Sequence, residues 1–157
     1  MVEKSSMTVD LGPFDEMRSK LAKGYYARVG ILKDISYPDG TSVALVGAVQ
    51  EFGSITNNIP VRSWLRMPLQ EKKQQLLDVL TSGTVKRFFA AGDIIRVLKT
   101  VGIAAETIID EGFSTGGFGK WAPDKPKTAK RKGSDAILQD TALLRKSVTS
   151  DVVNPNG

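Results

Sequence analysis

The residues whose side chains could carry out chemistry are few and scattered. The chain has 157 residues and contains no histidine and no cysteine, so the commonest general base, the commonest metal ligand and all thiolate chemistry are missing. Asp110 and Glu111 are adjacent on a predicted helix and point about 100° apart, and Asp93 lies several helical turns from Glu106. None of these carboxylates converges as a general acid and base must. The sequence therefore predicts a protein that is not an enzyme and has no catalytic residue, cofactor or metal site.

The glycine-rich stretch GFSTGGFGK (112–120) is only faintly similar to a phosphate-binding loop. It follows a predicted helix, and it lacks both the strand, loop and helix context and the Gly-Lys-Ser/Thr signature of such loops. We therefore do not interpret it as a nucleotide site.

A local basic segment accounts for the net charge of the chain. Residues 120–132 hold six cations against the single carboxylate of Asp124, and the whole chain has a net charge of +5. The cations are Lys120, Lys125, Lys127, Lys130, Arg131 and Lys132. With Trp121 available for stacking, the segment is a candidate contact for DNA or for an acidic protein surface. A solvated, flexible loop has the same composition, so that alternative stays open.

Hydrophobic periodicity predicts a helix near the N-terminus over 13–21, a strand over 25–32, a turn-rich loop over 33–42 and a helix over 44–52 closed by Gly53, for which a strand is the alternative. A helix over 69–80 and a single long helix over 84–111 follow, and small residues on the latter, among them Gly102 and Ala105, predict close approach of a sheet or another helix. A short helix over 137–144 and a strand over 147–152 end the pattern. The chain fits one domain.

Its organisation is a leader (1–12), a helix-strand-helix core (13–111), a long extended Gly/Lys-rich loop (112–134) and a C-terminal helix, strand and tail (135–157). No window approaches the roughly 20 apolar residues that span a bilayer. We therefore expect a soluble protein that has no membrane partner.

The stretch EFGSITNNIPVRSWL (51–65) joins turn formers, apolar residues and two opposite charges. Glu51 and Arg62 either form an ion pair that closes the loop between them or are separately solvated. Trp64, Leu65 and Met67 are expected in the core or at an interface.

Several motifs in order resemble the small tail-completion, or virion morphogenesis, proteins of tailed bacteriophages, from about residue 29 to residue 150. The motifs are Glu51-Phe52-Gly53, Ile59-Pro60-Val61-Arg62-Ser63-Trp64-Leu65, Trp121-Ala122-Pro123, Thr128, Arg131-Lys132-Gly133-Ser134 and Leu138-Gln139-Asp140-Thr141-Ala142-Leu143-Leu144-Arg145-Lys146-Ser147. The chain departs from the pattern at Ala142, where these proteins usually have glycine, and at Trp64, where phenylalanine is more usual. The first departure is expected to alter a turn before the last helix and strand.

The resemblance implies an α+β fold in which a small antiparallel sheet packs against two or three helices. It also implies a structural protein of the virion neck, assembled in the bacterial cytoplasm as a homo-oligomeric, sixfold ring. The implied partners are other neck, connector, tail-tube or terminator proteins, and genomic DNA that passes through the ring without sequence recognition. The competing hypothesis is a small basic DNA-binding protein that uses the segment from Lys120 to Lys132.

Apolar anchors and adaptable loops are what a ring subunit requires. The candidate assembly residues are Glu51, Phe52, Gly53, Ile59, Pro60, Arg62, Trp64, Phe113, Phe118 and Trp121. We expect the two charges to serve assembly more than folding. We also expect the 112–134 loop to be mobile in the free subunit and to order against a neighbour, with its three aromatic residues as anchors.

Overall fold

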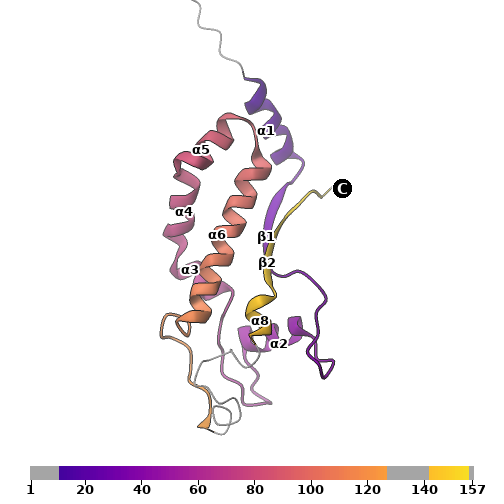
Figure 1. The fold of residues 1–157 in the computed structure, drawn as a ribbon, viewed down its shortest axis with the longest axis vertical. Coiled ribbons are helices and arrows are strands. Elements are labelled where there is room, and N and C mark those ends of the chain that lie inside the picture. The colour runs from indigo at the N-terminus through magenta and orange to yellow at the C-terminus, as the bar shows by residue number, and fades with distance from the viewer. Residues whose placement is uncertain (1–10, 127–141, 156–157) are drawn as a thin grey trace, which may run out of the picture.

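One long helix, α6 (Ile94–Ser114), runs through the middle of the protein. The structure is a computed structural model and describes residues 11–126 and 142–155. The antiparallel pair β1 (Tyr26–Ile31) and β2 (Val148–Val153) lies on one side of α6, and α4 (Lys73–Thr81) and α5 (Gly83–Ala90) lie on the other (Figure 1). The fold is thus α+β, with a small antiparallel sheet packed against helices, as expected.

The sheet brings together two segments that are far apart in the chain. Tyr26 lies opposite Val153 and Ile31 opposite Val148, which confirms both predicted strands. Gly102 of α6 faces Ser150 of β2, and a Cβ added at Gly102 would lie 2.6 Å from the Ser150 Oγ atom. The predicted close approach at this small residue is therefore confirmed, since only glycine leaves the required space.

The prediction of one helix over 84–111 is wrong. The chain turns at residues 91–93, where Gly92 has a φ of 69°, and α5 and α6 are separate helices that lie side by side. The Asp93 side chain accepts a hydrogen bond from the Arg96 N–H at 3.1 Å and caps α6. Ala91 and Gly92 thus form a turn, and they do not belong to a helix face.

The helix predicted over 69–80 is likewise divided, at Lys72, into α3 (Arg66–Glu71) and α4. The predicted helices near residues 13–21 and 44–52 are confirmed as α1 (Gly12–Ala22) and α2 (Val43–Phe52). Ser42 caps α2 by accepting a hydrogen bond from the Leu45 N–H at 3.4 Å. At the C-terminal side, α8 (Leu143–Lys146) precedes β2, and the rest of the predicted 137–144 helix lies outside the described residues.

The prediction of an extended loop beginning at residue 112 is wrong in its first part. α6 continues to Ser114, and Phe113 on its last turn is only 1% exposed. Turns follow over residues 115–120, and residues 121–126 then run beside the 58–64 segment, to which they are hydrogen-bonded. Residues 127–134 lie outside the described part of the chain.

Two clusters of buried side chains form the core. One lies where α5 meets the start of α6 and contains Val85, Ile94 and Val97. The other lies at the opposite end of α6 and joins α2, α6, α8 and the segments around two tryptophans. Its members are Val43, Trp64, Ile109, Phe113, Trp121 and Leu144. The residues of the 51–65 stretch and of the Trp-Ala-Pro motif therefore meet in this second cluster.

Candidate assembly site

The last turn of α2 fixes the geometry of the Glu-Phe-Gly motif. Glu51 is buried at 4% exposure, whereas its neighbour Phe52 points outward at 64%. Gly53 ends the helix with a φ of 75°, and a Cβ there would lie 3.1 Å from the Ile59 carbonyl oxygen. Glycine is required at this position because the conformation is left-handed and the returning chain is close.

A short hairpin, residues 53–61, follows α2. Ser54 and Ile59 exchange backbone hydrogen bonds of 2.9 and 2.8 Å, and the Ser54 hydroxyl accepts hydrogen bonds from the backbone N–H and the side-chain amide of Asn57. Ile55 at the tip is fully exposed. The hairpin therefore protrudes with a defined shape before the chain re-enters the core at Trp64.

The Glu51 carboxylate organises the return of the chain. One of its oxygens accepts hydrogen bonds from the Ser63 hydroxyl at 2.8 Å, the Arg66 backbone N–H at 3.3 Å and the Arg66 Nε at 2.8 Å. The other oxygen accepts the Leu65 N–H at 2.9 Å. Four donors thus converge on one buried carboxylate, and they tie the start of α3 to the end of α2.

Burial alone raises the pKa of the Glu51 carboxyl group, because desolvation disfavours its charged form. The hydrogen bonds from Arg66, Leu65 and Ser63 outweigh that effect and hold the pKa below its ordinary value. Glu51 therefore stays ionised at neutral pH, and its charge is used for structure.

Arg62 holds the segment of the Trp-Ala-Pro motif. Its Nε donates to the Ala122 carbonyl at 2.9 Å, and one terminal nitrogen donates to the Pro123 carbonyl at 3.0 Å. The same nitrogen lies 3.0 Å from a carboxylate oxygen of Asp124, and both side chains of this ion pair are only 7% exposed. Arg62 therefore binds three consecutive residues of a segment 60 positions further along the chain.

Both sequence-based alternatives for Glu51 and Arg62 are wrong. The two side chains do not pair with each other, and neither is solvated, since Glu51 pairs with Arg66 and Arg62 with Asp124. The two motif charges lie inside the subunit, so charge reversal at either position is expected to impair folding first.

Three aromatic rings pack against one another in the core beside these charges. The centroids of Trp64 and Phe113 lie 5.9 Å apart, and those of Phe113 and Trp121 lie 5.7 Å apart in an edge-to-face contact. The Trp64 indole N–H donates to the Gly47 carbonyl at 2.8 Å, and that of Trp121 donates to the Ser63 carbonyl at 3.2 Å. The structure thus places Trp64 and two of the three aromatic anchors expected in the 112–134 loop, Phe113 and Trp121, in the core of a single copy of the chain.

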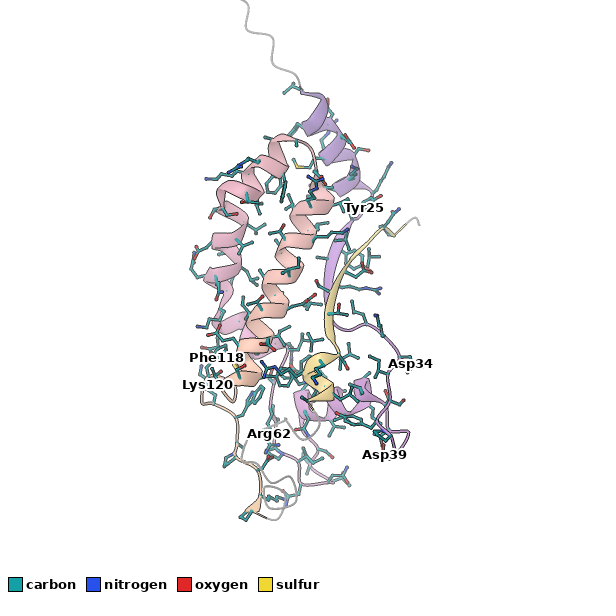
Figure 2. All side chains as sticks on the ribbon, in the orientation of Figure 1. Tyr25, Asp34, Asp39, Arg62, Phe118 and Lys120 are labelled. Carbon is teal, nitrogen blue, oxygen red and sulfur yellow. The ribbon has the colours of Figure 1, made fainter. Side chains whose placement is uncertain are left out.

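The described part of the basic segment makes local contacts. Lys120 pairs with Glu71 at 2.5 Å, and the Lys125 ammonium donates to the Asn58 carbonyl in the hairpin at 3.2 Å. Phe118, at the same end of α6 as Lys120 (Figure 2), has the Lys72 ammonium 5.0 Å from its ring centroid. Lys127, Lys130, Arg131 and Lys132 lie outside the described residues.

The sequence analysis missed several residues that complete these contacts. Ser63, Arg66 and Asp124 hold the two motif charges, and a further ion pair joins Asp110 of α6 to Arg145 of α8. The Arg145 hydrogen bonds lower the pKa of the Asp110 carboxyl group. Ser63 and Arg145 stand inside the quoted motifs, but no local pattern shows which residues they contact, because each partner comes from another segment.

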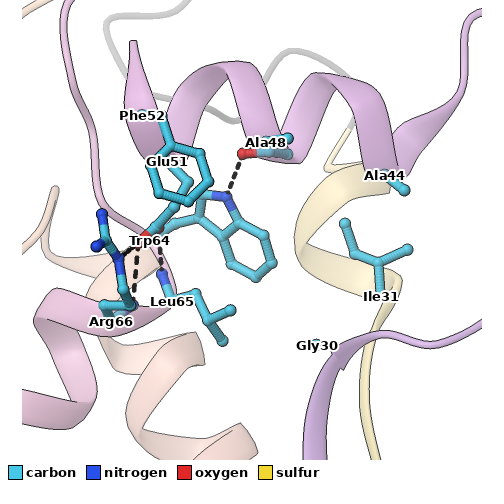
Figure 3. A pocket seen from close by; sticks show the side chains of 10 residues that line it. Gly30, Ile31, Ala44, Ala48, Glu51, Phe52, Trp64, Leu65 and Arg66 are labelled. Atoms are coloured by element: carbon cyan, nitrogen blue, oxygen red, sulfur yellow. Dashed lines mark hydrogen bonds and ion pairs between the residues drawn. The ribbon is translucent and has the colours of Figure 1, made fainter.

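An apolar pocket lies between α2, the end of β1 and the start of α3, with a volume of about 260 Å³ (Figure 3). Ile31, Ala44 and Ala48 lie on one side of it, and Phe52 and Leu65 on the other. The Arg66 guanidinium stands 4.7 Å from the Phe52 ring centroid. The outer face of α2 is apolar as well, because its exposed residues are alanine, leucine and phenylalanine.

Neither a scan against protein-family models nor searches of curated proteins and of solved structures found a match to this chain. Within residues 11–126 and 142–155, no group of three or more acidic residues gathers where it could hold a metal ion. In the same ranges no helix is long and apolar enough to cross a bilayer. The site is therefore interpreted from its own geometry.

Proposed function

We propose that the chain is a structural subunit of a tailed-bacteriophage neck, which assembles into a ring that completes the tail or joins it to the head. One observation carries the proposal: the motifs that resemble tail-completion proteins and lie in the described residues converge in space, although up to 70 positions of sequence separate Glu51 from Trp121. Glu51, Arg62, Trp64 and Trp121 all belong to one buried assembly of contacts. Motifs whose residues contact one another in this way are expected to specify the same local structure in the proteins that share them.

The character of the contacts supports a structural role. Among the buried charges at the motifs, Glu51 is satisfied by an arginine side chain, a hydroxyl and backbone N–H groups, and Arg62 by a carboxylate and backbone carbonyls. A protein that works by repeated subunit contacts also needs exposed apolar surface. Here that surface is contiguous with the motifs, and it comprises Leu45, Phe52, Ile55 and Val61, each at least 58% exposed.

The competing DNA-binding hypothesis gains no support from the described cations of the basic segment. Lys120 is paired with a carboxylate and Lys125 with a backbone carbonyl. Binding to any duplex with a steep salt dependence, together with no ring formation, would favour that hypothesis over ours.

The decisive experiment is electron microscopy of lysates of a phage from which this gene is deleted, with and without complementation by the intact gene. We expect filled heads and tails side by side and unjoined, or tails with defective upper ends, and we expect complementation to restore whole particles. Intact, infectious particles without complementation would contradict the proposal. Negative-stain images of the purified protein test the expected sixfold ring separately.

A further inference from the structure

The tip of the hairpin is built as a rigid apolar knob. Ile55 is fully exposed, and the backbone hydrogen bonds between Ser54 and Ile59 close the turn beneath it. A left-handed Asn58, with a φ of 51°, completes the turn and donates its N–H to the Ile55 carbonyl at 3.0 Å. A preformed knob loses little conformational entropy when it binds, and an exposed isoleucine gains free energy when it is covered.

The pocket beneath α2 is a matching hole. Its lining atoms are mainly apolar, and the one carboxylate in its wall, that of Glu51, already accepts four hydrogen bonds. Arg66 stands at the edge with its charge paired. An apolar side chain can therefore enter without leaving a buried charge unpaired.

We infer that this pocket accepts Ile55 of a second copy of the chain. The inference rests on the proposed function, because a ring requires each subunit to contact two neighbours through different surfaces. Residues 53–61 carry no charge, and α2 has no charged residue other than the inward-facing Glu51. Knob and hole are thus both apolar and uncharged, and the cations beside them, Lys125 at the hairpin and Arg66 at the pocket edge, contact the Asn58 carbonyl and Glu51.

The exposed apolar side chains around the pocket favour a second copy over a small apolar ligand, which would leave Leu45 and Phe52 uncovered. α2 is about 15 Å long, so its outer face offers on the order of 150 Å², well below the roughly 800 Å² per partner of a stable interface. The contact must therefore extend beyond α2 and include the exposed hairpin side chains of Ile55 and Val61 from the second copy. A contact in which one surface binds a different surface of the next copy repeats, and it closes into a ring when the rotation allows.

The test uses two complementary variants of the full chain. Ile55→Asp spoils the knob and keeps the hole, whereas Ala48→Trp blocks the hole and keeps the knob; both positions are exposed in the subunit. Light scattering after size exclusion should show a ring for the wild type and a monomer for each variant. An equimolar mixture should give a one-to-one heterodimer that grows no further. Ile103→Asp on α6 and Ala90→Trp on α5, both at exposed positions away from the pocket, should leave the ring unchanged.

A disulfide cross-link between copies tests the same contact in a way that misfolding of a variant or weak affinity cannot imitate. Because the chain has no cysteine, Ile55→Cys and Ala48→Cys introduce the only thiols in their respective chains. Mild oxidation of the mixture should form the 55–48 disulfide between copies, and a mixture of Ile55→Cys with Ile103→Cys should not.

The outcomes separate this inference from the proposed function. Rings that persist in both Ile55→Asp and Ala48→Trp would overturn the inference and leave the neck proposal standing. A wild type that stays monomeric at every concentration, or a mixture that forms neither heterodimer nor disulfide, would also overturn it. In those cases the deletion phage still decides the neck proposal independently.

Discussion

Replacing Glu51 by glutamine should strongly destabilise the subunit. All four groups that face the carboxylate are donors, namely the Ser63 hydroxyl, two backbone N–H groups and the Arg66 Nε. Glutamine supplies only one acceptor oxygen, so its NH₂ group must face a donor. A lost charge-assisted hydrogen bond costs about 1.5–3 kcal/mol and an unsatisfied buried group about 1–3 kcal/mol. Allowing for relaxation, we expect the free energy of unfolding to fall by about 2–4 kcal/mol.

Arg66→Gln provides the matched comparison. The Arg66 side chain is 59% exposed, so solvent screens its ion pair, and its loss should cost only about 0–1 kcal/mol. The remaining donors still satisfy Glu51 in this variant. A larger loss of unfolding free energy in Glu51→Gln than in Arg66→Gln would therefore show that the stabilisation comes from the buried carboxylate and its backbone donors.

The assay is urea unfolding at 25 °C, monitored by the fluorescence of the two tryptophans beside the site. With a slope of about 2 kcal/mol per molar urea, which is typical of a small domain, Glu51→Gln should lower the midpoint by about 1–2 M. Because the pKa of Glu51 is lower in the folded chain than its ordinary value of 4.5, its stabilisation is present above pH 4.5. It is lost as the pH falls through the folded pKa. The difference in unfolding free energy between wild type and Glu51→Gln should therefore become smaller below pH 4.5. A difference under about 0.5 kcal/mol at pH 7, or a difference that does not change with pH, would refute the reasoning.

Three other substitutions test separate features. Arg62→Lys should cost about 2 kcal/mol or more in unfolding free energy, since an ammonium cannot bind two carbonyls and a carboxylate in the planar geometry of a guanidinium. A variant as stable as the wild type would show that the contacts of Arg62 with residues 122–124 do not stabilise the fold. Ala142→Gly should stabilise by about 0.5–1 kcal/mol, because Ala142 has a left-handed φ of 53°, and a lower melting temperature would count against that assignment. Gly102→Ala should destabilise, since its Cβ would collide with β2, whereas Gly83→Ala, whose Cβ meets nothing within 4 Å, should not; equal effects in thermal melts would reject the packing argument.

The sequence predicts elements well where their signals are local. The strand over 25–32 and the helix that ends at Gly53 were found because residue type, periodicity and capping agree within a few positions. The break between α5 and α6 was missed although Gly92 and Asp93 carry ordinary end and start signals. The apolar stripe continues across them, and a periodicity argument gives such a stripe more weight than two turn residues.

The site was less predictable because its partners are distant in sequence. Glu51 meets donors 12–15 positions later, and Arg62 binds a segment 60 positions later. The Gly/Lys-rich composition of residues 112–134 predicted a long extended loop that includes the glycines of 116–119. In the structure one of them, Gly117, makes room for the Trp121 ring, so this glycine serves packing. Composition does not distinguish these two uses of glycine.

The buried charges have a further consequence if the hairpin is the knob of a ring contact. Both strands of the hairpin are fastened to the last turn of α2: Gly53 ends that helix, and the Arg62 N–H donates to the Gln50 carbonyl at 2.8 Å. The same helix forms one wall of the pocket, so the contacts of Glu51 fix the knob relative to the hole. An angular error at each contact accumulates around a closed ring, and directional hydrogen bonds limit such errors better than apolar packing of the same volume. On this view, the buried charges serve orientation, although an apolar core would stabilise the subunit at least as well.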